Sequence, residues 1–356
     1  MVRAGSESVQ VRGAVARRVT RGMAACAAIV AALLLSACGD QRQTDEIIVY
    51  TSRADHLVKP VFDAYTAETG TAIRFITDNE AALITRLEAE GAASPADMLI
   101  TVDAGNLWLA ADRGLLQSVS DERLESTVPA NLRDPDGQWF GLTVRARTLV
   151  YSTERVDPDT LSTYEALADD AWQDRVCLRT SKKVYNQSLV ATMIERLGEA
   201  EAERVVKGWI DNLATDVFAN DNAVMEAIVA GQCDVGIVNT YYFGRLLRER
   251  PDLPLRLFWA NQGEGESGVH VNISGAGLTR NAPNAEAALD LLAWMAQPQA
   301  QRILADGNME YPVNADVMPD EQVAAWGDFR PDALNVEIAG RRQVEAVKLM
   351  DRAGYR

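Results

Sequence analysis

The sequence predicts an α/β protein with two lobes, each built on a mainly parallel sheet that is flanked by helices. Short apolar runs alternate along the chain with segments whose apolar residues recur at helical spacing, and this order produces a parallel sheet. The alternation is interrupted by a loop section at 129–141 and restarts near residue 176. About 318 residues follow an amino-terminal leader, and one hydrophobic core seldom grows to that size.

Residues 1–38 have the composition of an export signal. Five arginines precede the apolar stretch 24–35, which is too short to span a bilayer comfortably. The segment Leu35–Cys38 resembles the lipobox of bacterial lipoproteins, whose cysteine is acylated and becomes the new amino terminus. A plain signal peptide with a chance cysteine and a noncleaved anchor are the alternatives. We predict a periplasmic location, with the protein tethered to the membrane through lipidated Cys38.

The acidic balance outside the leader argues against one class of function. Removing the leader's five arginines and one glutamate from the 35 basic and 51 acidic residues of the chain leaves a net charge of −20. A nucleic-acid-binding protein needs a basic face for the phosphates, so this class is disfavoured. The balance permits a cationic ligand without requiring one, because surface carboxylates also keep a protein soluble.

The first lobe begins with strands that alternate with helices. Strands are expected at 46–52, 72–76 and 97–102, and the helices between them should end near Gly70 and Gly91. This order predicts a doubly wound parallel sheet.

The pattern restarts after a strand that leaves the first lobe at 149–151. The elements expected beyond it are strands at 176–179, 216–218 and 233–238, a return crossing at 273–278, and helices at 188–197, 202–212, 223–230, 285–296, 299–305 and 335–351. We therefore divide the chain into a first N-lobe segment (45–146), a C-lobe (147–275), and an N-lobe return segment with the carboxy-terminal helices (276–356).

Two cysteines follow the leader. Cys177 lies in a strand-like run, and Cys233 opens the apolar strand 235–238. If those strands are neighbours in a parallel sheet, the sulfurs could lie within bridging distance, and an exported protein can be oxidised. Two buried free thiols are the alternative.

Two adjacent tyrosines, Tyr241 and Tyr242, follow that strand after a short polar turn. Ligands of open α/β sheets bind outside the carboxyl ends of the strands, so these phenols are candidates for a binding site. The alternative is a half-buried aromatic pair that starts the next helix.

The architecture and several short motifs resemble those of a known family. Two α/β lobes joined by two crossings, behind an export signal, describe bacterial solute-binding proteins, which close on a ligand by a hinge. The implied fold is the type II periplasmic-binding fold. The sequence resembles the ferric-ion-binding proteins of bacterial iron-uptake ABC transporters, through the stretches Val49–Arg53, Ser94–Asp97, Trp139–Leu142, Arg145–Arg147, Tyr185–Leu189, Asn239–Tyr242, His270–Asn272 and Tyr311–Val313.

The resemblance implies that Tyr185, Tyr241 and Tyr242 coordinate Fe(III). This ion is small, hard and highly charged, and it prefers anionic oxygen donors. A free phenol has a pKa near about 10, and a bound trivalent cation displaces its proton. Three phenolates would neutralise the ion, and the affinity should fall in acid because protons then compete.

The first lobe departs from the family pattern. Relatives often carry a histidine, or His-Tyr, directly after the Ser-Arg of the first strand, where this chain has Ala54 and Asp55. Asp55 could supply an oxygen or His56 a nitrogen if the loop shifts. Equally, Asp55 could cap the helix that begins near Leu57, and we favour the cap. Glu80 matches a carboxylate ligand of one branch of the family, but it also suits the first turn of a helix.

Water or a small anion such as carbonate would then complete the iron shell. Arg53 and Arg145 are the candidates to hold that anion or to hydrogen-bond the phenolates, because a guanidinium presents paired donors to planar oxyanions. Their alternative role is ion pairing. His270 lies near the return crossing, and we expect it to be a hydrogen-bonded structural residue.

These observations predict a binding protein and not an enzyme. It would capture Fe(III) between the lobes and deliver it, as a monomer, to an ABC permease in the inner membrane. The alternative on the same fold is a receptor for an oxyanion or small organic solute. An enzyme is disfavoured because the chain has two histidines and neither a Gly-x-Ser-x-Gly nor a His-Glu-x-x-His motif.

Overall fold

The computed structural model of the protein describes residues 46–356. The export signal and Cys38 lie outside the described residues, so the signal peptide and its lipidation stay predictions. In the described part, no helix combines the length and hydrophobicity that crossing a bilayer requires.

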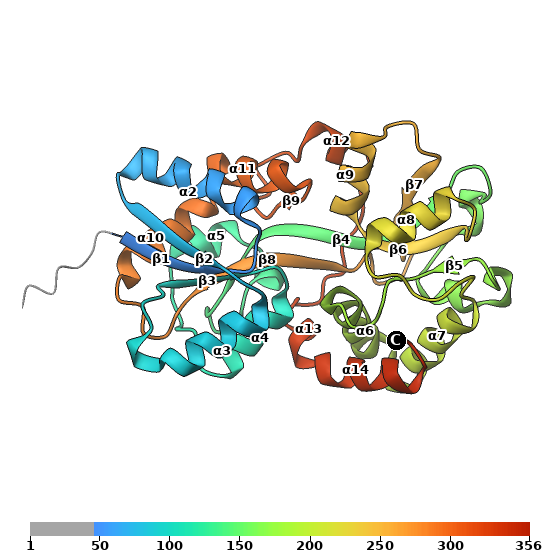
Figure 1. Cartoon of the computed structure of the whole chain (residues 1–356), viewed down its shortest axis with the longest axis horizontal. Coiled ribbons are helices and arrows are strands. Elements are labelled where there is room, and N and C mark those ends of the chain that lie inside the picture. Colours follow the sequence, from blue (N-terminus) through green and yellow to red (C-terminus); the bar gives the residue numbers. More distant parts are fainter. Residues whose placement is uncertain (1–45) are drawn as a thin grey trace, which may run out of the picture. The chain divides into compact units, whose positions relative to one another are not determined.

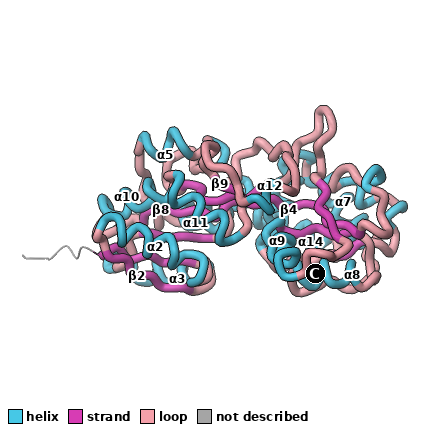
Figure 2. Tube along the Cα trace, turned by 90° about the horizontal axis from the view of Figure 1, so that it is seen from above, coloured by secondary structure: helices cyan, strands magenta, loops and turns pink. Residues whose placement is uncertain are grey.

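The strands of the described part form one mixed sheet in the order β2-β1-β3-β8-β4-β6-β5, with β7 and β9 also paired to β4. Helices cover both faces of this sheet (Figure 2). The predicted α/β fold class is confirmed. The strands are β1 (Glu46–Thr51), β2 (Ala72–Thr77), β3 (Met98–Thr101), β4 (Phe140–Ser152), β5 (Val176–Cys177), β6 (Val235–Asn239), β7 (Leu255–Phe258), β8 (Val271–Leu278) and β9 (Tyr311–Pro312).

Strand β4 connects the two lobes. Its first half pairs with β8, in a register that sets Arg145 opposite Asn272. Its second half pairs with β6, in a register that sets Arg147 opposite Asn239. Both pairings are antiparallel, whereas β1, β2 and β3 are parallel to one another and β5 is parallel to β6. The sheet is therefore mixed because the crossing strands run against their neighbours (Figure 1).

The helices fall into groups before and after β4. They are α2 (Asp55–Thr69), α3 (Glu80–Glu90), α4 (Ala104–Asp112), α5 (Glu122–Thr127), α6 (Val184–Leu197), α7 (Glu199–Asp211), α8 (Asp221–Val229), α9 (Thr240–Glu249), α10 (Ala285–Met295), α11 (Pro298–Asn308), α12 (Glu321–Ala324), α13 (Ile338–Arg341) and α14 (Gln343–Arg352). The helix expected at 335–351 is two helices that meet at Arg342, and the strand expected at 216–218 is only an isolated bridge at Phe218.

Two main hydrophobic cores define the lobes. The core of the first lobe packs β1, β3 and the start of β4 against α2, α3 and α10. The core of the second lobe packs the end of β4 and β6 against α6 and α7. Helix α14 belongs to this second core through Ala346, Leu349 and Met350, although it follows the return segment in sequence. The chain therefore ends on the second lobe.

A disulfide joins Cys177 at the end of β5 to Cys233 just before β6, and the two Cα atoms are 5.9 Å apart. Both cysteines are buried. The bond therefore joins two parallel strands, β5 and β6, close to the carboxyl end of one and the start of the other.

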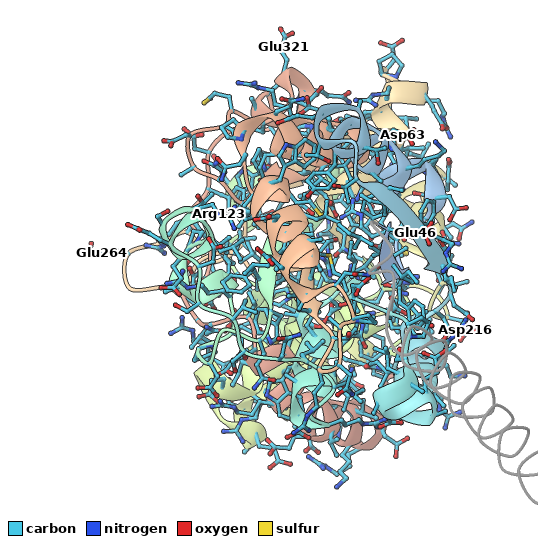
Figure 3. All side chains as sticks on the ribbon, turned by 90° about the vertical axis from the view of Figure 1, so that its left-hand side faces the viewer. Glu46, Asp63, Arg123, Asp216, Glu264 and Glu321 are labelled. Atoms are coloured by element: carbon cyan, nitrogen blue, oxygen red, sulfur yellow. A yellow bond between two sulfur atoms is a disulfide. The ribbon has the colours of Figure 1, made fainter. Side chains whose placement is uncertain are left out.

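Charged side chains stand out over the surface of the described part, as Asp63, Glu264 and Glu321 do in Figure 3. Many surface carboxylates pair with arginine, for example Glu203 with Arg352 and Glu226 with Arg250. The acidic balance of the chain is thus carried by its solvated surface.

Candidate metal site

Residues of both lobes and of the crossing strand line one cavity of about 470 Å³, which we call the cleft. The first lobe contributes residues 52–54 and 77–80, and β4 contributes Arg145. The remaining polar lining consists of Lys183, Tyr185, Tyr241, Tyr242, Arg245, Asn308 and Glu310. The three candidate tyrosines, the two candidate arginines and Glu80 therefore share one cavity.

The tyrosines lie at the beginnings of two helices of the second lobe. Helix α9 begins at Thr240, directly after β6, so Tyr241 and Tyr242 lie at the carboxyl end of that strand. Their ring centroids are 4.4 Å apart. Tyr185 is the second residue of α6. Two helix amino termini thus bring three phenols together, and such termini favour negative charge.

A buried network fixes the two tyrosine-bearing segments to each other. Arg147, only 2% exposed, donates to Asn186, Asp221 and Asn239, each at 3.0 Å. Asn186 directly follows Tyr185. The backbone N–H of Asn239 also donates to Asp221 at 2.9 Å. One arginine on the crossing strand therefore sets the relative position of α6 and the start of α9.

Burial makes two of the phenols harder to deprotonate. It raises the pKa of Tyr185 to about 12, although the charge of Arg145 opposes the rise. Burial also raises the pKa of Tyr241 well above its ordinary value, and negative charge on Tyr185 or Tyr242 would raise it further. A cation that binds to these oxygens must displace their protons.

Four cationic side chains lie against the phenol rings. The Arg145 and Arg179 guanidinium carbons are 5.3 and 5.4 Å from the centroid of the Tyr185 ring, and Lys183 Nζ is 4.9 Å from it. The Arg245 guanidinium carbon is 5.2 Å from the Tyr241 ring centroid. Positive charge at this distance favours the deprotonated phenol.

Arg53 and Arg145 both form buried ion pairs. Arg53 binds Glu310 at 3.1 Å, and Arg145 binds Asp103 at 3.2 Å. Burial alone would raise the pKa of Glu310, but the charges of Arg53 and Arg145 lower it below its ordinary value. Each arginine also keeps one buried donor, Arg53 Nε and Arg145 Nη1, that has no partner among the described residues. The structure therefore shows the ion-pair role of both arginines, and it leaves one buried donor on each of them without a partner among residues 46–356.

The first-lobe candidates differ in their access to the cleft. Glu80 lines it from the first residue of α3. Asp55 and His56 are exposed and do not line it. The residue that caps α2 is Ala54, without a side-chain bond, so the interpretation of Asp55 as a cap is wrong. The Asp55 carboxylate instead accepts a hydrogen bond from Thr77 Oγ1 at 2.5 Å, because the carboxyl end of β2 lies beside the start of α2.

His270 lies outside the cleft and is 5% exposed. Its Nδ1 is 3.1 Å from the hydroxyl of Thr192, and burial lowers its pKa to about 3. The expectation of a hydrogen-bonded structural histidine is confirmed. No cluster of three or more His, Cys, Asp or Glu residues within 46–356 is arranged to hold a metal, so a metal in the cleft would depend on the phenols.

Several contributors to the cleft were not predicted from the sequence. No local motif marks Lys183, Arg245 and Glu310, which line the cleft, or Arg179, which lies against the Tyr185 ring. Asp221, the buried anchor of the network, could have been suspected from Asn220-Asp221, because an Asn at a helix start is a common capping signal.

Comparison with known proteins agrees with this geometry. Residues 61–331 match the family model of bacterial extracellular solute-binding proteins. Iron uptake proteins A1 and A2 of Synechocystis sp. are 40% and 43% identical to this chain, over 92% and 94% of it and 95% and 96% of their own lengths. The structure of the Trichodesmium protein IdiA (FutA), in complex with iron and citrate, is 41% identical. It superposes with a TM-score of 0.84, covering 87% of this chain and all of its own.

The share of the chain that matches and the identity to these relatives settle the family. The resemblance that the motifs indicated is confirmed over nearly the whole described length. The chain belongs to the bacterial extracellular solute-binding proteins, within the branch of periplasmic ferric-ion-binding proteins of iron-uptake transporters.

Proposed function

We propose that this protein captures Fe(III) in the cleft through the phenolates of Tyr185, Tyr241 and Tyr242 and delivers it to an ABC permease. The observation that carries the proposal is the convergence in one cavity of three phenols, of which Tyr185 and Tyr241 are buried and lie against cationic side chains. Similarity to proteins named for iron uptake supports the choice of metal. We place the protein in the periplasm, tethered through Cys38, as a monomer with no catalytic activity.

The donor set selects a hard, highly charged cation. Three phenolates balance the charge of Fe(III), and such hard anionic oxygens bind a small trivalent ion more strongly than a divalent one. The phenols must lose up to three protons on binding, and burial opposes this loss because it raises the pKa of Tyr185 and Tyr241. The charges of Arg145, Lys183 and Arg245 lower the cost of that deprotonation.

The remaining iron positions would be completed from the other side of the cleft. Glu80 lines the cleft beside Asp78 and Asn79, whereas Asp55 and His56 would need the loop to move. A small anion such as carbonate would use the free donors of Arg53 and Arg145. The first lobe would thus close over iron that the second lobe already holds, by bending the crossing strands β4 and β8.

The experiment that tests this proposal is a titration of the metal-free protein with ferric citrate near neutral pH, followed in the visible spectrum. A phenolate-to-iron charge-transfer band should grow and saturate at one equivalent. Thermal unfolding measured on the same samples should shift upward, because the ion binds only the folded chain. A colourless complex, or no band together with unchanged thermal stability, would refute tyrosinate ligation.

A second candidate function rests on the free arginine donors. An oxyanion or small organic solute could use Arg53 Nε and Arg145 Nη1, with the phenols as hydrogen-bond donors. Calorimetry of the metal-free protein with phosphate, sulfate and polyamines separates the two functions. Tight binding of one of these solutes in the absence of iron would favour this candidate.

A further inference from the structure

Asp103, the ion-pair partner of Arg145, is a carboxylate of the first lobe that does not line the cleft. It caps the amino terminus of α4, where its Oδ1 accepts the backbone N–H of Gly105 at 2.9 Å. The side chain is fully buried. A helix cap needs neither burial nor a charge, because serine or asparagine caps a helix equally well, and burying a carboxylate is costly unless it is paired. The other contacts of Asp103 therefore indicate a further role.

Both crossing strands donate hydrogen bonds to Asp103. Arg145 of β4 and Asn272 of β8 lie opposite each other in the sheet. They donate to Oδ2 of Asp103 at 3.2 and 3.0 Å. Arg145 also donates to the carbonyl of Val102, and Asn272 Oδ1 accepts the backbone N–H of Ala104 at 3.0 Å. The segment that leads into α4 is therefore bonded to both crossing strands at the same level of the sheet.

The same carboxylate reaches the second lobe. The hydroxyl of Ser188 on α6 lies 3.1 Å from each oxygen of Asp103 and donates to them. Ser188 follows Tyr185 by three residues on α6, so the two side chains are neighbours on the surface of that helix. Helix α13 packs against both α4 and α6, and Figure 1 shows it between them. Asp103 therefore connects the first lobe to a helix that carries a candidate metal ligand.

Arg145 extends this connection to the phenol. Its guanidinium carbon lies 5.3 Å from the centroid of the Tyr185 ring, and the side chain lines the cleft. Glu310 is a second buried carboxylate that interacts with the charge of Arg145, and it lines the same cleft. If Asp103 lost its charge, Glu310 would be the stronger partner and would draw the guanidinium away from Tyr185.

We propose that Asp103 is a positioning residue of the metal site, which holds Arg145 over Tyr185 and fixes α6 against the first lobe, so that neutralising this carboxylate weakens metal binding. The proposal rests on the function proposed above, because it concerns the same site. Asp103 acts on the metal through Arg145 and Ser188. Groups that orient metal ligands in this way commonly change the metal affinity by roughly 10–100-fold.

Asp103→Asn is the variant that tests the carboxylate. Asparagine keeps the size of the side chain and an acceptor that caps α4, but it removes the charge that pairs with Arg145. Fe(III) affinity, measured near neutral pH by competition with citrate, should fall roughly 10–100-fold. Urea unfolding of the same variant shows how much of the protein is folded, so the affinity refers to folded protein.

Asp97→Asn is the matched control. Asp97 is also a fully buried aspartate of the first lobe, and it does not line the cleft. Its carboxylate accepts the backbone N–H groups of Ile48 and Asn284, at 2.8 and 2.7 Å. This variant should lower the free energy of unfolding, but it should leave the Fe(III) affinity of the folded protein unchanged within about twofold.

A double-mutant cycle with Tyr185→Phe separates positioning from a general structural role. Tyr185→Phe keeps the ring and removes the phenolate that Arg145 and α6 hold in place. Asp103→Asn should therefore weaken Fe(III) binding by about threefold or less in the Tyr185→Phe background. A general structural role predicts the same loss in both backgrounds. Ser188→Ala removes the contact with α6, keeps the ion pair, and should weaken Fe(III) binding about fivefold.

The outcomes distinguish this proposal from the function on which it rests. A parent protein that binds no Fe(III) overturns both. If the parent binds Fe(III), equal affinity in Asp103→Asn, or the same loss with and without Tyr185→Phe, overturns the positioning role alone. Should Asp103→Asn fail to fold, Ser188→Ala decides, because an affinity equal to that of the parent overturns the positioning role and a fivefold loss supports it.

Discussion

The two sides of the cleft differ in how their polar side chains are supported. On the second lobe, the buried network of Arg147, Asp221 and Asn239 holds three phenols at two helix starts. On the first lobe, Arg53 is engaged with Glu310, and Glu80 lies at the partly exposed start of α3. The difference supports the proposed division of labour, in which the second lobe would hold the metal and the first lobe would complete its shell on closure.

The largest effect should follow removal of two phenols from the second lobe. Tyr241→Phe/Tyr242→Phe removes two anionic oxygens and leaves the apolar contacts of the rings, so Fe(III) binding and its visible band should both disappear. Absorbance titration checks this. Tyr311→Phe is the control, because Tyr311 is a mostly buried tyrosine that does not line the cleft. If the double variant keeps the band, the second lobe is not the metal-holding side.

The next largest effect should come from pH. The pKa of Tyr185 is raised to about 12 and that of Tyr241 is raised well above its ordinary value, so both phenols are protonated below pH 8 and must release protons on binding. The affinity should therefore rise with pH and fall as the pH drops, by up to about three orders of magnitude per unit if three protons are released. Competition titrations between about pH 5 and 8 measure the slope. A pH-independent affinity would contradict phenolate ligation.

His270 makes the stability of the folded protein depend on pH. This effect must be distinguished from the pH dependence of iron binding. The pKa of His270 in the folded state is about 3, below the ordinary value of 6.5. As the pH falls, this histidine is protonated in the unfolded chain before it is protonated in the folded chain. The contribution of His270 to the free energy of unfolding is therefore fully present above pH 6.5 and is lost as the pH falls toward 3. The total is on the order of a few kcal/mol. Urea unfolding of His270→Gln should show a shallower loss of stability in acid, and an unchanged slope would contradict the assignment.

Breaking the network should weaken both folding and iron binding. Asp221→Asn leaves Arg147 buried without its carboxylate partner, which should cost about 3–5 kcal/mol in the free energy of unfolding. Iron affinity should fall roughly 10–100-fold, because the start of α9 loses its anchor. Chemical unfolding and iron competition measure the two effects. Asp216→Asn, which changes an exposed carboxylate of the same lobe, should change neither the free energy of unfolding nor the iron affinity.

The smallest effects should come from the first lobe. Glu80→Gln should weaken Fe(III) binding by about tenfold or less, ~1.4 kcal/mol, and Asp55→Asn should leave it unchanged, because only Glu80 lines the cleft. Both variants keep their size and differ from the parent by one charge. A larger loss in Asp55→Asn than in Glu80→Gln would show that closure brings the loop after β1 onto the metal.

Local patterns predicted the elements that are apolar and bounded by turns. The strand before Tyr241 is an uninterrupted buried run, so its carboxyl end and the phenols beyond it were found from the sequence. The crossing strand β4 was expected only at 149–151. Thr143, Arg145 and Arg147 interrupt its apolar pattern, because they serve the cleft and the buried network. These polar residues therefore kept most of the longest strand from being predicted.

The sequence pattern could not predict which charged residues pair with partners far away in the chain. A buried arginine such as Arg179 cannot be told from a surface arginine by its neighbours in sequence, because the carboxylate that accepts it, Asp221, lies 42 residues away. The pairing of Arg53 with Glu310 spans 257 residues. Helix α4 was missed although Asp103, its capping residue, and the spacing of Leu107 and Ala110 provide a signal.

The measurement that tests the central claim most directly is resonance Raman spectroscopy of the Fe(III)-loaded protein, excited within its visible band. Phenolate ring modes enhanced by the iron should appear in the parent and in Glu80→Gln, and they should be absent in Tyr241→Phe/Tyr242→Phe. Enhanced phenolate modes in that double variant, or their absence from the parent, would contradict the claim that the second lobe holds the metal.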